Sequence, residues 1–185
     1  MALRADRRWA AELLQVWFHA LEPADHFRQS DAVDAMLRRR FARDWAALYT
    51  QPAESFARSP GDALGAVLLF DQVPRNLFRD SATAFATDPL ARAIAKTAMA
   101  RGFDRGMEKA ERQFLYMPLM HSEQIADQLL SLRLFTQLGR GFGMPFARSH
   151  YRMIARFGRF PHRNAVLGRQ STAAEERAVA AGNDW

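Results

Sequence analysis

The stretch SPGDALGAVLLFDQVPRN, residues 59–76, decides the fold class of this chain. Ser59 is typical of a residue that caps a helix, and Pro60 suits the first helical position. Residues 63–70 are apolar on nearly every side, so we expect this helix to lie at the centre of the packing. Pro74 lacks the backbone N–H that a helix interior needs and is expected to stop it. The stretch therefore predicts a buried helix in an α-helical protein.

Helical spacing and helix punctuation recur on both sides of this stretch, whereas strand alternation does not. Further helices are expected at about 6–21, 31–48, 90–102, 107–117, 123–138 and 145–158, with a short last helix after Thr172. We expect Ile125, Leu129, Leu132 and Phe135 to face inward. The pattern predicts an all-α fold of seven to eight antiparallel helices. We expect them to form one domain over residues 1–185, in which 171–185 are a short helix and tail.

The composition is that of a globular protein. Apolar residues make up 49% of the 185 residues and include 14 Phe and 4 Trp, which allows a sizeable core. The chain has no cysteine, which excludes disulfides, thiolate nucleophiles and cysteine-bound metal clusters. No apolar run approaches the roughly 20 residues of a membrane span, and we expect neither a secretory signal nor membrane binding. We predict a cytoplasmic protein.

The net charge of +6 is unevenly placed. Residues 1–92 hold 12 arginines and 12 acidic residues, whereas residues 93–185 hold 14 basic and 8 acidic residues. Residues 139–170 contain no acidic residue but seven arginines, at 140, 148, 152, 156, 159, 163 and 169. Such a stretch can meet phosphates or acidic partners. Arginine outnumbers lysine 24 to 2, so part of this content is compositional bias.

Asp71, Arg75 and Asn76 are the first candidate site residues. Asp71 lies near the C-terminal end of the apolar helix, where the helix dipole disfavours an anion, so its carboxylate needs a partner. Arg75, or an arginine from further along the chain, can supply it. These residues either clamp the chain at the break after Pro74 or shape a ligand site.

A second segment, RFGRFPHRN at residues 156–164, also ends a helix, turns at a proline and finishes in Arg-Asn. Its candidate side chains are those of Arg159, His162, Arg163 and Asn164. Arginine supplies a planar bidentate donor, and asparagine supplies an amide that can satisfy backbone groups. The two Arg-Asn corners are either mutual helix caps or two walls of a pocket, in which Arg75 and Arg163 bind a carboxylate or phosphate.

His121, Glu123, Asp127 and His150 form a third candidate group. Glu123 and Asp127 are four residues apart and share one helical face near its N-terminus, where acids also complement the dipole. His150 precedes three apolar residues at helical spacing and therefore faces the core, where a histidine is more often structural than catalytic. If His150 meets either acid, its pKa would rise and a general acid/base pair would form.

Metal binding would need two of the histidines at 121, 150 and 162 with Glu123 or Asp127. None of these residues has the His-x-x-x-His spacing that places two ligands on one helical face, so we predict no metal ion. Glycine-rich phosphate loops, Gly-x-Ser-x-Gly and His-Glu-x-x-His motifs are absent from the sequence. The sequence indicates no particular cofactor.

Nucleic-acid binding through residues 140–169 is the least favoured alternative. Arg148, Arg152 and Arg156 recur every four residues and could meet phosphates. Aromatic residues are interleaved with them, but Phe146 and Phe157 are expected on the core-facing side, which removes them as stacking platforms.

Four stretches, LLFDQVPRNLFR, AFATDPLA, HSEQIADQ and ARFGRFPHRNAVLGRQSTAAE, together resemble a bacterial family of domains of unknown function, the one numbered 924. The resemblance covers residues 17–185. It implies tetratricopeptide-like helical hairpins packed in a compact domain, and it implies no established activity. It also places a set of residues on motif positions, namely Asp71, Pro74, Arg75, Asn76, His121, Glu123, Arg159, Pro161, His162, Arg163 and Asn164. Val73 stands where a bulkier aromatic residue is expected, a difference that affects packing.

The sequence therefore predicts a bacterial cytosolic protein with a polar Arg/Asn/His pocket for a small anionic molecule. The alternative is a non-catalytic, tetratricopeptide-like module that binds a peptide or a partner protein. The sequence determines neither whether the chain is an enzyme nor its oligomeric state.

Overall fold

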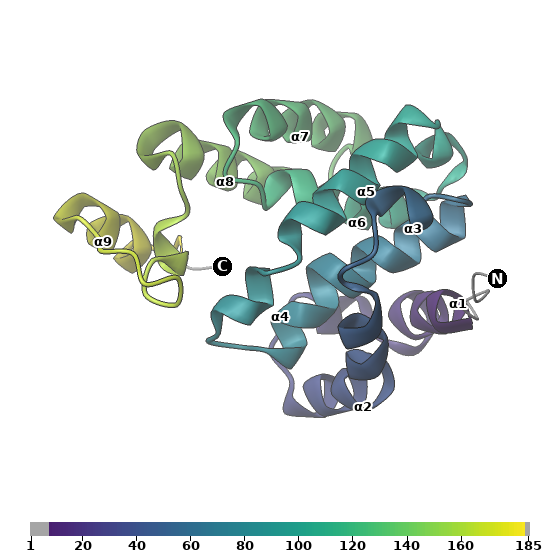
Figure 1. Cartoon of the computed structure of the whole chain (residues 1–185). Helices are drawn as coiled ribbons and strands as arrows, with labels where there is room; N and C mark the ends of the chain where they lie inside the picture. Colours follow the sequence, from purple (N-terminus) through teal and green to yellow (C-terminus); the bar gives the residue numbers. More distant parts are fainter. Residues whose placement is uncertain (1–7, 184–185) are drawn as a thin grey trace. The chain divides into compact units, whose positions relative to one another are not determined.

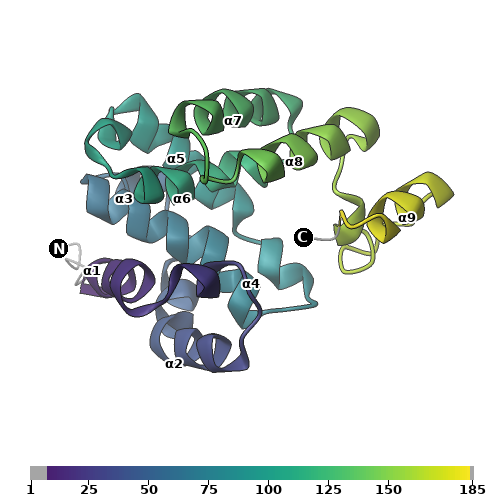
Figure 2. The same ribbon diagram turned by 180° about the vertical axis from the view of Figure 1, so that it is seen from behind.

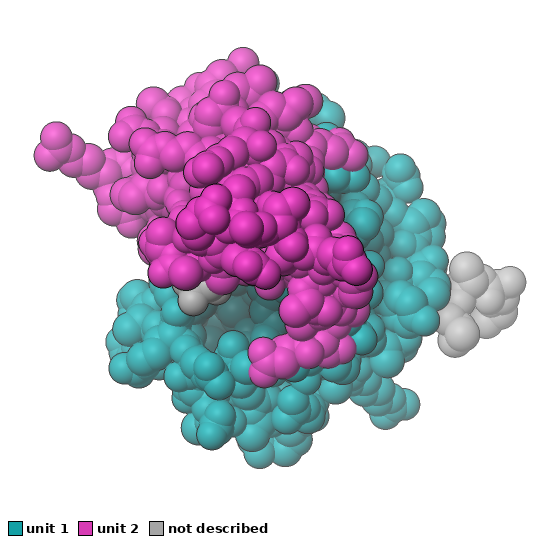
Figure 3. Space-filling view, turned by 90° about the vertical axis from the view of Figure 1, so that its left-hand side faces the viewer, with its two compact units in different colours: residues 1–79, 83–107 teal, residues 80–82, 108–185 magenta. Residues whose placement is uncertain are grey.

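The computed structural model describes residues 8–183, and this range contains helices and no strand (Figures 1 and 2). The prediction of an all-α fold is thereby confirmed. The chain forms two compact units (Figure 3). Unit 1 comprises residues 1–79 and 83–107, and unit 2 comprises residues 80–82 and 108–185. The single domain and the tetratricopeptide-like packing stay predictions.

Unit 1 contains α1 to α5, linked by short 3-10 and π turns. Its α-helices are α1 (Arg8–Gln15), α2 (Asp31–Leu48), α3 (Pro60–Val67), α4 (Val73–Leu77) and α5 (Asp88–Ala100). Its π turns are η1 (Val16–Ala20) and η4 (Leu68–Gln72), and its 3-10 turns are η2 (Pro23–His26), η3 (Ala53–Ser55) and η6 (Phe103–Gly106). The 3-10 turn η5 (Ala82–Phe85) begins at Ala82 of unit 2 and continues into unit 1. α3 packs against α1 and α5, and α4 packs against α2.

The central position expected for the apolar helix is confirmed, because residues 63–70 are all buried. α1 approaches α3 most closely at Gly65. A Cβ atom on Gly65 would lie 2.9 Å from Ala10 Cβ and 3.1 Å from Ala10 Cα, closer than real Cβ atoms pack. The contact between α1 and α3 therefore requires glycine at this position.

Pro74 does not stop the central helix, so this prediction was wrong. α3 continues through the π turn η4 into α4 (Figure 1). Pro74 cannot donate to the carbonyl four residues earlier, and Phe70 O instead accepts a 2.7 Å hydrogen bond from Thr87 Oγ1. The next carbonyl, Asp71 O, accepts a hydrogen bond from the Arg75 guanidinium. Two side chains thus satisfy carbonyls at the point where the helix carries a proline.

Unit 2 contains α6 (Lys109–Met120), α7 (Ile125–Leu138), α8 (Met144–Phe157), the 3-10 turn η7 (Pro161–Arg163) and α9 (Ala173–Ala180). α7 packs against both α6 and α8, and α9 packs against η7 (Figure 2). Met153, Ile154, Phe160 and Ala178 form a small apolar core. α6 runs through Pro118 to Met120, so the end predicted at residue 117 was also wrong.

The inward face of α7 differs from the one expected. Ile125 and Leu129 were predicted to face inward but are 46% and 52% exposed, whereas Phe135 is buried as predicted. The inward face instead includes the buried polar residues Gln128 and Ser131. Gln128 is retained there because its amide donates hydrogen bonds to backbone carbonyls at the end of α6.

Three helices begin at a residue whose side chain caps them. Ser30 Oγ accepts from Val33 N, and Ser59 Oγ accepts from Asp62 N. Thr172 and Glu175 form the expected capping box of α9. Among the described residues, no helix combines the length and the apolar character needed to cross a membrane.

Candidate functional site

The first Arg-Asn segment lies in α4 of unit 1 and is bound to acidic residues of that unit. Arg75 donates to both carboxylate oxygens of Asp88 at 3.0 Å and lies 3.6 Å from the fully buried Asp71 carboxylate. Burial opposes the charge of Arg75, but Asp88 and Asp71 outweigh it and raise the pKa of the guanidinium. Asp71 thus has the arginine partner that the sequence suggested.

Asn76, the other half of this corner, binds a carboxylate from α2. Asn76 Nδ2 donates to Asp34 Oδ1 at 2.8 Å, and Arg79 binds both oxygens of Asp34 at 2.5 and 2.8 Å. Burial disfavours the charged carboxyl, but these bonds outweigh it and lower the pKa of Asp34. Acidic side chains of unit 1 therefore hold both Arg75 and Asn76. Sequence reasoning missed Asp34 and Asp88 as partners because they lie 42 and 13 residues away in sequence from Asn76 and Arg75.

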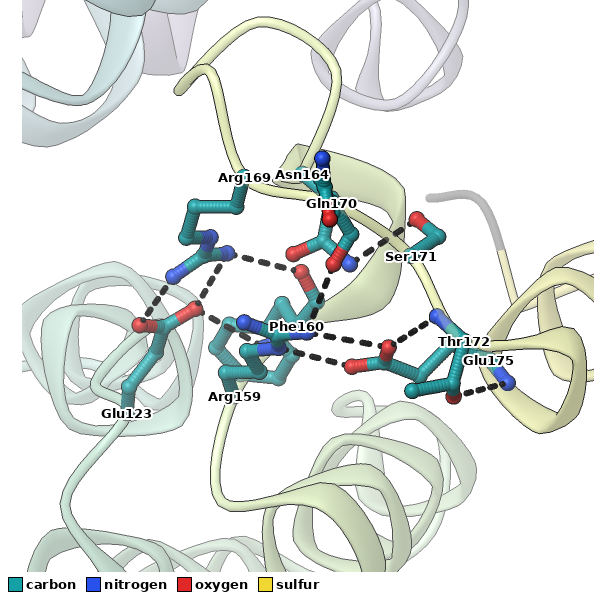
Figure 4. Close-up of polar contacts among 9 residues, drawn as sticks. All are labelled: Glu123, Arg159, Phe160, Asn164, Arg169, Gln170, Ser171, Thr172 and Glu175. Atoms are coloured by element: carbon teal, nitrogen blue, oxygen red, sulfur yellow. Dashed lines mark hydrogen bonds and ion pairs between the residues drawn. The ribbon is translucent and has the colours of Figure 1, made fainter.

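The second Arg-Asn segment lies in unit 2, between α8 and α9 (Figure 4). Arg159 binds both carboxylate oxygens of Glu175 at 2.7 and 3.0 Å, and also donates to Gln170 O at 2.9 Å. The bonds from Arg159 and from the Thr172 backbone lower the pKa of Glu175 to about 2. Asn164 is fully buried and donates to Ser171 Oγ at 3.0 Å. Arg159 therefore fastens α9 to the end of α8.

Glu123 fixes the turn that follows α8 (Figure 4). Its carboxylate accepts from the backbone N–H of Phe160 at 2.8 Å and from both terminal nitrogens of Arg169. Arg169 also donates to Phe160 O at 3.0 Å. Burial opposes the charge of Glu123, but the bonds from Arg169 and Phe160 outweigh it and lower the pKa of the carboxyl. Both backbone groups of Phe160 are thus held, which sets the position of its ring.

Two histidines and one arginine lie against that ring, and a third histidine, His121, lies beside one of them. We call His121, His150, His162 and Arg163 the His–Arg cluster. The ring centroids of His150 and His162 lie 5.3 and 5.7 Å from that of Phe160. The Arg163 guanidinium carbon lies 4.6 Å from the Phe160 centroid. The ring of His121 lies 5.9 Å from that of His150. His121, His150 and Arg163 are buried, and His162 is half-buried.

His150 is neutral at pH 7 in this setting. Its Nδ1 lies 2.9 Å from Phe146 O, and because a carbonyl only accepts, Nδ1 carries the hydrogen and Nε2 carries the lone pair. Burial, together with the electrostatic effects of the other three cluster members, lowers the pKa of His150 to about 2. A carboxylate partner would raise this pKa, so the direction is opposite to the one that the predicted acid/base pair requires.

The two acids of that predicted pair make other bonds. Glu123 is held by Arg169 and Phe160, and the buried Asp127 accepts from Ser122 Oγ at 2.8 Å. The catalytic roles of His150, Glu123 and Asp127 stay predictions. No group of three His, Asp or Glu side chains among residues 8–183 has an arrangement that could hold a metal ion.

The structure thus brings four of the predicted residues together, those of the His–Arg cluster. Sequence reasoning missed two further features of unit 2. Arg169 was seen only as part of the acid-free stretch. Gln128 Oε1 and Ser131 Oγ were not considered, although both are buried without a hydrogen-bond partner. The sequence did carry a signal for the burial of Gln128 and Ser131. Residues 128 and 131 are spaced to share one helical face with the buried Phe135.

The fold and the site together define an all-α protein whose second unit carries a buried cluster of histidine and arginine around a phenylalanine. The chain belongs to the family described as "Bacterial protein of unknown function (DUF924)", which it matches over residues 13–183. The resemblance stated from the sequence is therefore confirmed.

A solved structure with the same fold is that of a protein of unknown function, ATU0120, from Agrobacterium tumefaciens. It shares 36% sequence identity with this chain and superimposes with a TM-score of 0.88. The match covers 94% of this chain and 97% of the other. No curated protein matches the chain.

Proposed function

We propose that unit 2 binds a small anionic ligand, a carboxylate or a phosphate, at the His–Arg cluster. The observation that carries this proposal is the sign of the charges around His150. Its neighbours His121, Arg163 and His162 all act as positive charges that lower its pKa. A cluster of positive side chains favours an anion beside it, because the anion offsets the repulsion between the positive groups.

The arginine of the cluster suits an anion in shape as well as in charge. Arg163 is buried, and its guanidinium carbon lies over the ring of Phe160, 4.6 Å from the centroid. A planar guanidinium presents two parallel N–H groups to a carboxylate or phosphate. Glu123, whose pKa is lowered in part by Arg163, already binds Arg169 through both oxygens. The negative charge of Glu123 is therefore directed toward Arg169, and the ligand would bring a negative charge to Arg163.

The proposal uses the second Arg-Asn segment alone. In the first segment, Arg75 and Asn76 bind Asp88 and Asp34. Protein carboxylates thus take the place that an anionic ligand would have, which supports the clamp interpretation of that corner. The anion pocket predicted from both corners is accordingly narrowed to the cluster in unit 2.

Thermal unfolding with inorganic phosphate or succinate tests this proposal, because a ligand that binds the native state raises the unfolding temperature. We expect a concentration-dependent rise for the wild type and a loss of affinity of about tenfold or more for Arg163→Gln. Arg163→Lys, which keeps the charge but loses the planar fork, should lie between them. Arg152→Gln, at an exposed position of α8, is the matched control and should behave like the wild type.

Two results would contradict the proposal. One is an unfolding temperature of the wild type that responds to neither anion. The other is an equal response of the wild type and Arg163→Gln, which would assign the effect to anion binding elsewhere on the surface.

A second candidate function is association with a nucleic acid through α8. Arg148, Arg152 and Arg156 are all exposed on its outer face. Phe146, which was predicted to face the core, is instead 54% exposed. That prediction was wrong because residue 146 lies in the first turn of α8, where fewer neighbours cover it. Phe146 lies in the first turn of the helix that carries this row of arginines, and a combination of exposed aromatic rings and arginines is typical of single-strand binding.

Fluorescence anisotropy with a labelled single-stranded oligonucleotide tests this second function. Three phosphate contacts predict an affinity that falls about tenfold to twentyfold between roughly 50 and 200 mM salt. A variant with Arg148, Arg152 and Arg156 all changed to Gln should lose the binding. Binding that does not depend on salt, or none at low salt, would remove this candidate.

A further inference from the structure

The inward face of α7 carries two polar atoms that no group of residues 8–183 satisfies. Gln128 and Ser131 are fully buried, and Gln128 Oε1 and Ser131 Oγ have no hydrogen-bond partner. The orientation of the Gln128 amide is fixed, because Nε2 donates to Met120 O at 2.7 Å and to Ser122 O at 2.6 Å, and carbonyls only accept. Gln128 Oε1 is therefore an acceptor that needs a donor from outside the described protein groups.

Gln128 lies against the backbone of the His–Arg cluster. The two carbonyls that it binds belong to the residues on either side of His121. The ring of His121 in turn lies 5.9 Å from that of His150. The amide of Gln128 thus borders the cluster at its α6 end.

Ser131 lies at the level of His150 along the paired helices. Thr136 Oγ1 of α7 lies 3.8 Å from Met144 Sδ of α8, and the short connection between these helices makes them antiparallel. Ser131 lies five residues before Thr136 in α7, and His150 lies six residues after Met144 in α8. Because the helices are antiparallel, both steps run in the same direction in space. With a rise of about 1.5 Å per residue, the two positions differ by about 1.5 Å in height. Ser131 and His150 are both buried, and α7 packs against α8.

We infer that the anion bound at the His–Arg cluster also carries a hydroxyl group that binds Gln128 and Ser131, so that the ligand is a small hydroxy acid. This inference rests on the proposed function. Gln128 Oε1 can only accept a hydrogen bond, and Ser131 Oγ can donate one. A hydroxyl group donates to the first and accepts from the second, and so satisfies both atoms.

The charge of the cluster selects a hydroxyl over an ammonium group as the donor. An ammonium group would also donate to Gln128 Oε1, but it would meet the positive charges that already act on His150. A neutral hydroxyl group meets no such repulsion. The acid group of the ligand faces Arg163, and its hydroxyl group faces α7.

Calorimetric titration with malate and succinate tests the inference, because these two dicarboxylates differ by one hydroxyl group. At equal ionic strength, we expect one malate enantiomer to bind the wild type about fivefold to tenfold more tightly than succinate. Ser131→Ala should remove most of this preference while leaving the affinity for succinate unchanged. Ser131→Ala is also expected to fold, because it deletes a buried hydroxyl group that makes no hydrogen bond. Thr136→Ala, at an exposed position of the same helix, is the matched control and should keep the preference.

The results separate this inference from the proposed function. If succinate and both malate enantiomers bind equally to the wild type, or if Ser131→Ala keeps the preference, the hydroxyl site is wrong and the anion site stands. If neither acid binds and phosphate has no effect, both fail. A crystal structure of the malate complex, with the hydroxyl group within hydrogen-bond distance of Gln128 Oε1, would support the inference directly.

Discussion

Arg169 binds both carboxylate oxygens of Glu123, at 2.9 and 3.0 Å, across 46 residues of sequence. The same two side chains hold the N–H and the C=O of Phe160, so one ion pair fixes the turn after α8. Since His150, His162 and Arg163 lie against the ring of Phe160, this pair positions these members of the cluster without belonging to it.

Removing one partner of this pair should destabilise unit 2. We expect Glu123→Gln to lower the free energy of unfolding by about 1–3 kcal/mol, because it weakens three charge-assisted hydrogen bonds. Urea unfolding measures the loss, and Glu176→Gln, at an exposed position of α9, is the control. A double-mutant cycle with Arg169→Met should show coupling of the two positions, and additive effects would contradict the role assigned to the pair.

His150 should make stability depend on pH between 7 and 5. Burial and the neighbouring positive charges lower the pKa of folded His150 to about 2, whereas the unfolded residue takes up a proton near its ordinary value of 6.5. The unfolded state therefore binds more protons below pH 6.5, and stability falls as pH falls, by up to about 1.4 kcal/mol per pH unit.

Chemical denaturation at several pH values measures this slope. His150→Gln should reduce the pH dependence of the free energy of unfolding by the contribution of one titrating group. Arg152→Gln should leave this pH dependence unchanged. Part of the slope should remain in His150→Gln, because burial also lowers the pKa of His26 in unit 1. A variant slope equal to that of the wild type would show that His150 is protonated in the folded protein.

The close contact of α1 with α3 predicts an unusual cost for a small substitution. Gly65→Ala places a methyl group against Ala10 and should lower the free energy of unfolding by about 1–3 kcal/mol through overpacking. Gly106→Ala meets no atom within 4 Å and should change stability by no more than about 0.5 kcal/mol. Thermal or urea unfolding of both variants measures the difference, and equal effects would contradict the close approach.

The bond between Arg159 and Glu175 predicts local rather than global behaviour of α9. Arg159→Gln should speed amide hydrogen exchange in residues 173–180, because the helix then keeps a small apolar contact through Ala178 and a few polar bonds. Exchange in α6 and α7 should not change. Mass-spectrometric hydrogen exchange measures this, with Arg156→Gln as the control. Uniformly faster exchange throughout unit 2 would show that α9 is an integral part of its core.

Local signals in the sequence predicted the helices well. Ser59 caps α3 as expected and the last helix begins after Thr172 as expected, because a cap depends on residues within one turn. Pro74 was misjudged for the opposite reason. The group that satisfies the carbonyl at its break is Thr87, 17 residues from Phe70 in sequence, and no local pattern reveals such a partner.

The candidate site was predicted only in part. Its residue types were recognised, but the grouping of His121 with His150 arises from the packing of the α6–α8 helices and carries no spacing signal. The exposure of Leu129 was missed because the apolar pattern of α7 is continuous, whereas burial follows the polar contacts of Gln128. Tertiary hydrogen bonds thus overrode periodicity in this helix.

The π turn at Leu68–Gln72 has a consequence for insertions and deletions in the central helix of this chain. A π turn holds one more residue than an α turn, and each residue of an α-helix adds a rotation of about 100°. Deleting one residue from the turn would restore a regular helix but rotate Arg75 and Asn76 by about 100°, away from Asp88 and Asp34. The number of residues between Ser59 and Arg75 therefore determines which carboxylates the side chains of Arg75 and Asn76 meet.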